Sequence, residues 1–243
     1  MANHKVVSRE EWLEARHEHL KKEKEFTRLR DEVSRHRRDM PWVKLDKEYL
    51  FDTERGKRSL ADLFEDCSQL ITYHFMFHPD WEQGCKSCSF LADSYAGSAA
   101  HLKARNVSLV TVSKASLDQI NTFKTRMGWN FPWVSSGPSD FNRDFHVSFT
   151  EEELENASAY YNYRKMGFPE VEAPGISVFF KDDDGTVYHT YSSYGRGLDM
   201  FITTYHLLDI VAQGRDEQDL PYSMAWIRHH DKYDDPDDGG SFH

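Results

Sequence analysis

The stretch that decides the fold reads LITYHFMFHPDWEQGCKSCSF and covers residues 70–90. Its first part, residues 70–77, is a nearly continuous apolar run, which is typical of a central strand covered on both faces. A short loop follows, and then come two cysteines separated by two residues, Cys85 and Cys88. Over residues 89–105 the apolar side chains recur at helical spacing. We therefore predict a strand, a loop, a dithiol and a helix, in that order.

The segments beyond this helix predict a sheet that contains parallel strands. Residues 107–113 form a second buried strand, and Ser116 caps a helix that runs to Met127. This strand–helix–strand–helix order requires right-handed crossovers between parallel strands. Further on, strands at 176–180 and 186–191 flank an Asp-rich turn with a glycine, which predicts a β-hairpin.

Three other parts complete the predicted organisation. A capping-box signature precedes residues 9–38, which contain neither Pro nor Gly, so we predict a long charged helix. Its sparse apolar stripe favours packing along one edge of the domain, with a homodimerisation arm as the alternative. We assign residues 1–40 to an N-terminal helical arm, 41–230 to an α/β domain and 231–243 to an acidic tail.

The region from 128 to 170 lacks a regular pattern, and we interpret it as an insertion within the domain. A capping box at Thr150 predicts a helix in it that ends at about Lys165. Short helices are also predicted at 59–66 and, as the last amphipathic helix, at 199–212.

Composition and charge exclude several classes of protein. Of the 243 residues 39% are hydrophobic and 29% charged, which is the composition of a globular protein. The formal net charge of −11 argues against a large basic patch, so we expect no nucleic-acid partner. No apolar run approaches the ~18 residues that span a bilayer, and the N-terminus lacks the apolar core of a signal peptide. We therefore expect no membrane association and a cytoplasmic location.

The three cysteines, Cys67, Cys85 and Cys88, are too few for a disulfide scaffold. In a reducing compartment a close pair indicates redox chemistry or metal binding. The first thiol of the pair would meet the unpaired N–H groups and the positive end of the helix dipole, both of which lower a thiol pKa, and Lys86 adds a nearby cation. The second thiol lies one turn further on and can displace a substrate from a mixed disulfide. We predict Cys85 as nucleophile, Cys88 as resolving thiol and Cys67 as a structural residue.

The order of these elements resembles the thioredoxin superfamily, and the lead-in over residues 51–64 looks most like its peroxiredoxin branch. Nearly the whole chain is similar to a bacterial family of that superfamily that is known only as a domain of unknown function. The segments that carry this resemblance are residues 73–77, 84–90, 174–179 and 226–231. The resemblance implies a thioredoxin-like central mixed sheet flanked by helices. It also implies that Pro174 matches the cis-proline that faces the dithiol in thioredoxin-like proteins.

Two departures from the superfamily patterns bear on the activity. Thioredoxins usually carry a tryptophan directly before the first cysteine, whereas this chain has Gly84 there and Trp81 earlier. Peroxiredoxins usually carry threonine or serine three positions, and proline seven positions, before the reactive cysteine, where this chain has Glu82 and His78. We therefore expect a thiol–disulfide oxidoreductase or an atypical peroxide reductase, acting on a protein or small-molecule disulfide or on a peroxide.

Metal binding is the main alternative function. His74 and His78 precede the dithiol in the pattern His-x₃-His-x₆-Cys-x₂-Cys, and thiolates with imidazoles suit zinc or copper. His74 lies within the predicted buried strand, however, where it could simply be a structural residue, so we expect no metal and no other cofactor. A third possibility is a redox-sensing or interaction protein without catalytic activity.

Two further polar features lie towards the C-terminus. The segment RHHDKY at 228–233 could fold back over the dithiol and supply a proton or an anion contact, or it could be a solvated end of the chain. Arg196 precedes the last predicted helix and could help to hold an anion at its N-terminus, although we favour an ordinary surface arginine.

Overall fold

The computed structural model of the chain describes residues 4–95 and 97–234. It separates into two compact units, one ending at Trp42 and the other beginning at Val43. The first unit contains the long helix α1 (Arg9–Arg38), whose start has the predicted capping box: the Glu11 N–H donates to Ser8 Oγ at 3.2 Å, and Glu11 Oε2 accepts from the Ser8 N–H at 3.0 Å. None of the residues of α1 is buried within this unit.

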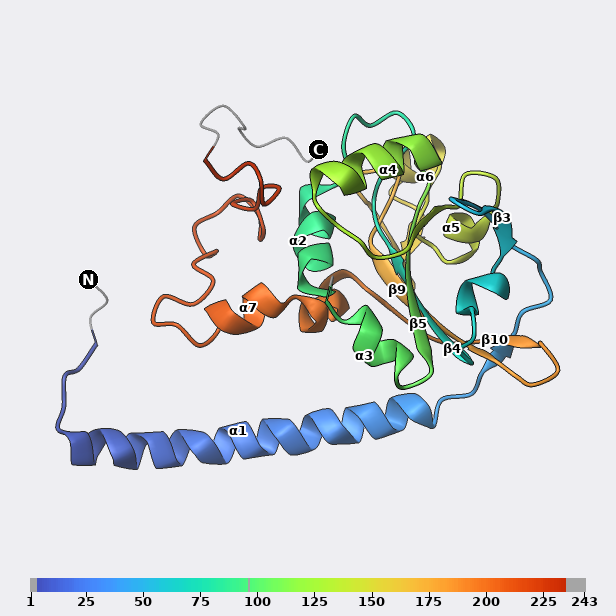
Figure 1. Cartoon of the computed structure of the whole chain (residues 1–243). Helices are drawn as coiled ribbons and strands as arrows, with labels where there is room; N and C mark the ends of the chain where they lie inside the picture. The colour runs from blue at the N-terminus through green and yellow to red at the C-terminus, as the bar shows by residue number, and fades with distance from the viewer. Residues whose placement is uncertain (1–3, 96, 235–243) are drawn as a thin grey trace. The chain divides into compact units, whose positions relative to one another are not determined.

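The second unit is built on one mixed sheet with the strand order β1-β10-β9-β4-β5-β6-β2-β3 (Figure 1). Its strands are β1 (Val43–Lys44), β2 (Leu50–Thr53), β3 (Gly56–Ser59), β4 (Gln69–His74), β5 (Val107–Ser113), β6 (Trp133–Ser135), β9 (Gly175–Lys181) and β10 (Val187–Tyr194). Strand β5 runs parallel to both of its neighbours, β4 and β6, whereas β9 runs antiparallel to β4, β2 runs antiparallel to β6, and β9 pairs with β10 as a hairpin.

The helical elements of this unit are short. They are the 3₁₀ helices η1 (Asp62–Phe64) and η2 (Gly195–Phe201) and the α-helices α2 (Lys86–Tyr95), α3 (Ala99–Lys103), α4 (Leu117–Arg126), α5 (Phe141–Asp144), α6 (Glu151–Glu155) and α7 (Thr203–Leu208). The order β4–α2–β5, followed by the hairpin β9–β10 beside β4 and then by α7, is the predicted thioredoxin-like arrangement. No helix in the described part of the chain is both long and apolar enough to cross a membrane.

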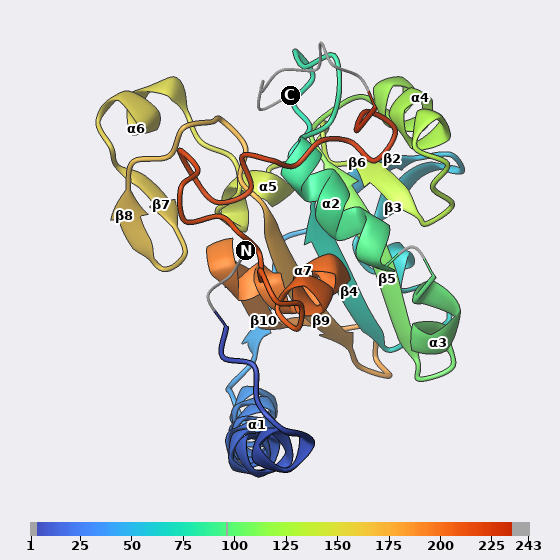
Figure 2. The ribbon, with the colours of Figure 1, turned by 90° about the vertical axis from the view of Figure 1, so that its left-hand side faces the viewer.

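The alternation of side chains along β4 divides the core into two layers. Tyr73 packs on one face of the sheet, in a cluster with residues of α2, α4 and α7 that includes both cysteines of the pair. Leu70 packs on the other face with Phe141 of α5 and Phe64 of η1. In the view of Figure 2, α2 and α7 lie in front of the strands β4, β9 and β10. The dithiol therefore belongs to only one of the two layers.

Several predicted elements have different lengths in the structure. The strand predicted at 70–77 leaves the sheet after His74, although the Phe75 N–H still donates to the Val112 carbonyl at 2.9 Å. The helix predicted at 89–105 is two helices, α2 and α3. The last helix, predicted at 199–212, is only α7, because the chain before it forms the tighter turns of η2.

The region from 128 to 170 differs most from its prediction. It supplies strand β6 of the main sheet, which is too short for a two-residue period to be seen in the sequence. The helix predicted to reach Lys165 was wrong, since α6 ends at Glu155 and a second sheet follows, made of β7 (Ala159–Tyr161) and β8 (Arg164–Met166). Asn162 and Tyr163 have positive φ values of 50° and 63°, which suit the two-residue turn between these strands.

Candidate functional site

Cys85 lies at the start of α2, as predicted, and its backbone is fixed on both sides. The Cys85 N–H donates to the Met76 carbonyl at 3.0 Å, in the segment that continues β4. The Cys85 carbonyl accepts from the Ser89 N–H at 2.9 Å and from Ser89 Oγ at 3.0 Å. The first thiol thus sits where the N–H groups of the first helical turn have no intrahelical acceptor.

The two thiols have opposite electrostatic surroundings. The pKa of Cys85 lies below its usual value because its sulfur accepts a hydrogen bond from the Cys88 thiol and others from the backbone N–H groups of Cys88 and Ser87, while Lys86 adds a positive charge. The pKa of Cys88 lies well above its usual value, chiefly because the thiol is buried, and also because of the hydrogen bond to Cys85 and the charge on it. All three cysteines are free thiols in this structure.

Two residues of the β4 segment contact the resolving thiol, and the sequence analysis did not identify their roles. The Met76 N–H lies 3.5 Å from Cys88 Sγ, so the backbone of Met76 contacts both cysteines. The hydroxyl of Tyr73 donates to the Cys88 carbonyl at 3.3 Å and also stabilises the Cys88 thiolate. Side chains alternate between the two faces of a strand, so the position of Tyr73 along β4 was the feature of the sequence that could have shown that it faces α2.

Gly84, the residue directly before Cys85, is held between two aromatic rings. A Cβ atom at this position would lie 2.6 Å from Phe75 Cε1 and 2.9 Å from Phe123 Cε1. A larger residue would have to displace one of these rings. This close packing explains why the tryptophan typical of thioredoxins has no room at Gly84.

Lys86, Trp81 and His78, which lie near the dithiol in the sequence and could support its chemistry, have different environments. The side chain of Lys86 is almost fully buried and its charge acts on Cys85. Trp81 packs against the core cluster that contains both cysteines. His78 instead forms contacts within its own loop, since its Nδ1 accepts from the Asp80 N–H at 3.3 Å and its ring lies 6.2 Å from that of Trp81.

The structure does not bring together the alternative metal ligands. His74 lies on the opposite face of β4 from the dithiol, where its ring stacks on Phe145 and its Nε2 lies 2.8 Å from Ser177 Oγ. Burial, together with the nearby His189, lowers the pKa of His74 to about 3, so the imidazole is neutral. In the described residues no group of three or more His, Cys, Asp or Glu side chains could hold a metal ion. The alternative metal set of His74, His78, Cys85 and Cys88 is therefore not assembled in this structure, because the parity of the strand separates His74 from the cysteines.

Pro174 differs from the cis-proline that the resemblance to thioredoxin-like proteins implies at this position. Its peptide bond is trans, like every other described peptide bond. Its carbonyl accepts from the hydroxyl of Tyr161 at 2.7 Å. Burial raises the pKa of Tyr161, and the charge of Cys88 adds to that rise, so this tyrosine lies within electrostatic reach of the resolving thiol.

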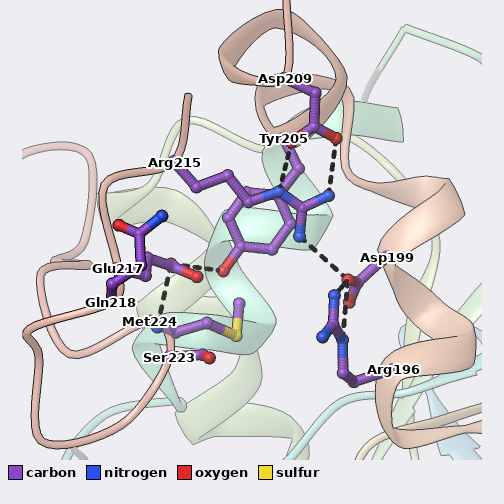
Figure 3. A pocket seen from close by; sticks show the side chains of 9 residues that line it. All are labelled: Arg196, Asp199, Tyr205, Asp209, Arg215, Glu217, Gln218, Ser223 and Met224. Carbon is purple, nitrogen blue, oxygen red and sulfur yellow. Dashed lines mark hydrogen bonds and ion pairs between the residues drawn. The ribbon is translucent and has the colours of Figure 1, made fainter. Parts of the chain in front are cut away.

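Arg196 lies in a separate polar network. Its guanidinium pairs with Asp199 at 3.0 Å, and it lines a cavity of about 540 Å³ together with Tyr205 and Arg215 (Figure 3). Neither cysteine of the pair lines this cavity. The favoured interpretation of Arg196 as a surface arginine agrees with its exposed side chain, which keeps 85% of its accessible surface.

The segment near the C-terminus folds back onto the start of α2 and is not a solvated end of the chain. His229 Nε2 donates to the Gly84 carbonyl at 2.8 Å. The Asp231 carboxylate accepts from Arg126 of α4 at 2.9 and 3.0 Å, and His230 Nδ1 lies 2.9 Å from Asp93 of α2. The predicted acidic tail is thus held at Asp231, while its residues 235–243 lie outside the described part of the chain.

The sequence matches one protein-family model over residues 1–233, that of a bacterial protein family of unknown function, DUF899. The chain therefore belongs to this family, which agrees with the resemblance noted in the sequence. No curated protein matches it.

Solved structures with a similar fold include the peroxidoxin BcpB from Mycobacterium tuberculosis, with 15% sequence identity and a TM-score of 0.43, covering 71% of this chain and 97% of that one. A PrxQ mutant from Xylella fastidiosa has 12% identity and a TM-score of 0.40 over 65% of this chain and 88% of that one. A putative thiol:disulfide interchange protein DsbE from Chlorobium tepidum has 13% identity and a TM-score of 0.41 over 68% and 97%.

Proposed function

We propose that this member of the DUF899 family is a dithiol oxidoreductase that reduces a disulfide or a peroxide with Cys85 and Cys88. One observation carries the proposal: two adjacent thiols at the start of α2 have pKa values shifted in opposite directions. A nucleophile must be a thiolate, whereas a resolving thiol must stay protonated until the first step is complete. The surroundings of Cys85 and Cys88 fit these two roles.

With a disulfide substrate the reaction takes two steps. The Cys85 thiolate attacks one sulfur, the substrate S–S bond breaks, and the other half leaves as a thiolate while a mixed disulfide forms on Cys85. Cys88 then loses its proton to the departing thiolate and attacks Cys85 Sγ, which releases the second half of the substrate. The products are a Cys85–Cys88 disulfide, one substrate thiol and one substrate thiolate that takes a proton from water, and an external dithiol would restore the reduced protein.

With a hydroperoxide the same residues give a different intermediate. The Cys85 thiolate attacks the terminal oxygen, the O–O bond breaks, and the alkoxide leaves and takes a proton from water to become the alcohol, so that Cys85 becomes a sulfenic acid. Cys88 attacks the sulfenic sulfur and water leaves, which again produces the Cys85–Cys88 disulfide. The hydroxyl of Tyr73 would stabilise the Cys88 thiolate during this second step, and Pro174 would shape the nearby surface through Tyr161.

The two single-cysteine variants test this order of events. In a Cys67→Ala background, Cys88→Ser exposed to hydroxyethyl disulfide at neutral pH should gain the mass of one mercaptoethanol adduct, because attack proceeds and resolution does not. Cys85→Ser should gain none, because the pKa of Cys88 lies well above its usual value and the thiol stays protonated at neutral pH. Intact-protein mass spectrometry measures both.

Equal trapping by the two variants would show that the order of nucleophile and resolving thiol is wrong. If neither variant reacts and the parent cannot be oxidised by disulfide or peroxide, the dithiol is structural, and the redox-sensing and enzymatic roles both fail. A reducing compartment such as the cytoplasm is the location at which such a dithiol would stay ready for reaction.

The helix α1 is the proposed partner surface for a second copy of the chain. Its side chains Trp12, Phe26, Leu29 and Val33 are exposed and lie on one arc of the helix. Apart from histidines, residues 9–20 contain four acidic and two basic side chains, and residues 21–38 contain eight basic and four acidic ones. Antiparallel pairing of two such helices would place opposite charges against each other and cover the apolar arc.

A further inference from the structure

We propose that residues 224–231, which we call the C-terminal cover, form a removable seal over Cys85 that admits small oxidants and slows bulky ones, and that His229 closes this seal. The inference rests on the proposed function, since it concerns which substrates reach the nucleophile. In both views of the ribbon the C-terminal segment runs beside α2, and in Figure 2 it crosses the end of α2 at which the cysteines lie. His229 is a positioning residue in this proposal and takes no part in bond making.

Both thiols of the dithiol are shielded from solvent. Cys85 is only 3% exposed and Cys88 only 2%. Thiol–disulfide exchange needs the attacking sulfur to approach one sulfur of the substrate, and its rate depends on that access. The terminal oxygen of a hydroperoxide demands much less space. The closed structure therefore discriminates by size before any chemistry takes place.

The inner part of the cover is hydrogen-bonded to the residue before the dithiol and shares a core cluster with it. His229 is almost fully buried and donates from Nε2 to the carbonyl of Gly84, the residue before Cys85. A carbonyl can only accept, so this contact requires a proton on Nε2. The imidazole also meets the ring of Phe123 edge to face at 5.3 Å, and Ile227 is fully buried in the same cluster as both cysteines.

The outer part of the cover is held by exposed polar contacts. Arg126 pairs with both oxygens of Asp231 and also donates to Gln83 Oε1 at 2.8 Å, just before the dithiol. The side chains of Arg126 and Asp231 keep about a third of their surface, at 30% and 33%. Ion pairs with this exposure contribute little to stability. These outer contacts of Arg126, which we call the rim, can therefore break without disrupting the core.

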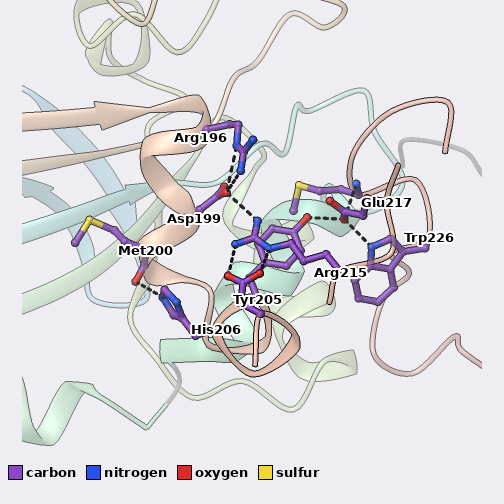
Figure 4. A network of polar contacts seen from close by, with 10 residues as sticks. Arg196, Asp199, Met200, Tyr205, His206, Arg215, Glu217 and Trp226 are labelled. Atoms are coloured by element: carbon purple, nitrogen blue, oxygen red, sulfur yellow. Dashed lines mark hydrogen bonds and ion pairs between the residues drawn. The ribbon is translucent and has the colours of Figure 1, made fainter. Parts of the chain in front are cut away.

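A separate anchor keeps the cover attached when it opens. Glu217 Oε1 accepts from the Tyr205 hydroxyl, from Trp226 Nε1 and from the Met224 N–H, at 2.8, 2.8 and 3.1 Å (Figure 4). Residues 209–223, which lead to this anchor, contain no buried residue. Glu217 thus holds the start of the cover, near Met224 and Trp226. The end of the cover is held in place by the contacts of His229 and Asp231 that are described above.

The test measures the selectivity of Cys85 in a background in which it is the only thiol, Cys67→Ala with Cys88→Ser. Second-order rate constants are measured for hydrogen peroxide and for the bulky aromatic disulfide 5,5′-dithiobis(2-nitrobenzoate). His229→Ala should raise the rate constant for the aromatic disulfide by about tenfold, the effect of one lost buried hydrogen bond, and leave that for peroxide nearly unchanged. His229→Gln should restore the parent selectivity, because its amide N–H can donate to the Gly84 carbonyl.

His101→Ala, at an exposed histidine of α3, is the matched control and should change neither rate constant. If His229→Ala proves unfolded by circular dichroism, Asp231→Asn opens only the rim and should give a smaller rise in the same direction. An unchanged ratio of the two rate constants in a folded variant would overturn the seal while leaving the proposed function intact. A Cys85 that reacts with neither reagent in any folded variant would overturn the proposed function itself.

Discussion

At the scale of single residues, Gly84 has a steric role beside the nucleophile. It has no side chain because Phe75 and Phe123 occupy the space that a Cβ would need. The Gly84 carbonyl accepts a hydrogen bond from His229, and the next residue is Cys85 at the start of α2. Substitution at this position should therefore disturb both stability and the reactivity of the thiol.

We predict that Gly84→Ala lowers the free energy of unfolding by about 1–3 kcal/mol, the usual cost of forcing an extra methyl group into a packed core. Urea denaturation measures it. Gly97→Ala is the matched control, since a Cβ there would meet no atom within 4 Å. Equal stabilities for the two variants would mean that the aromatic rings adjust freely.

Glu172 is a buried carboxyl group on which the proposed chemistry does not depend. It is 3% exposed, and it accepts from Ser148 Oγ at 2.6 Å and from Asn142 Nδ2 at 2.9 Å. Burial raises its pKa to about 7, against the two hydrogen bonds, which lower it. Between about pH 4.5 and 7 the folded protein therefore holds a proton that the unfolded chain has lost, and stability from this group falls as the pH rises.

We predict that Glu172→Gln removes this pH dependence. At pH 8 the variant should be more stable than the parent by up to about 3 kcal/mol, and near pH 4 the two should be nearly equal. The glutamine amide can replace the protonated acid if the side-chain amide of Asn142 flips. Ser136 Oγ now donates to Asn142 Oδ1, and after the flip Asn142 Nδ2 would donate to Ser136 Oγ. Denaturation at several pH values provides the measurement, and Glu152→Gln, on the exposed surface of α6, is the control. A constant difference across the pH range would contradict the prediction.

At the scale of secondary-structure elements, α1 belongs to a compact unit of its own and has no buried residue. It has strong local signals, including its capping box and a last turn rich in basic residues that complements the helix dipole. These features explain why the helix forms, but they do not explain its exposed aromatic and aliphatic side chains. A second copy of the chain would cover them.

We predict that Phe26→Gln weakens self-association, raising the dimer dissociation constant by about tenfold, as truncation of a buried aromatic anchor commonly does. Sedimentation equilibrium measures the constant. Lys24→Gln, on the opposite side of the helix, should leave it unchanged apart from a small charge effect. A parent protein that is monomeric at all concentrations would rule out the arm as a dimerisation element.

At the scale of the whole α/β unit, the chain returns from α7 to the start of α2 and so brings its C-terminal part to the candidate site. Arg215 participates in this return, since it pairs with Asp209 at 2.7 Å and with Asp199 at 3.0 Å and stacks on the ring of Tyr205 at 3.8 Å. Glu217 then fixes the beginning of the C-terminal cover. Most residues that line the cavity in Figure 3 belong to the segment that follows α7. The charged side chains among them largely pair with each other.

We predict that Glu217→Gln loosens the C-terminal cover without unfolding the sheet, because a carboxylate that accepts three hydrogen bonds becomes a neutral amide that accepts them less strongly. Amide hydrogen exchange over residues 224–231 should become about tenfold faster, while exchange in β4 and β5 stays at the parent rate. Glu155→Gln in α6 is the control. Faster exchange throughout the sheet would show that the anchor supports the fold as a whole and not the cover.

The amino-acid sequence by itself determined the features that depend on contiguous residues. The apolar run before the dithiol, the helical spacing after it and the hairpin turn with its glycine each predict one element, and their order predicts the thioredoxin-like sheet. The position of Cys85 at the start of α2 follows from the same local pattern. Hydrophobic periodicity is a property of a few neighbouring residues, so it can be read from the sequence without knowing the fold.

Only the tertiary structure decided which distant residues meet. Strand β6 is three residues long, and its place in the sheet depends on its pairing with β5. His74 and the cysteines are close in sequence, yet they lie on opposite faces of the sheet because the side chains of β4 alternate. His229 and Gly84 are 145 positions apart, and they form a hydrogen bond because the return of the chain brings them together. A contact at that separation depends on the packing of the whole unit, and no local pattern in the sequence specifies it.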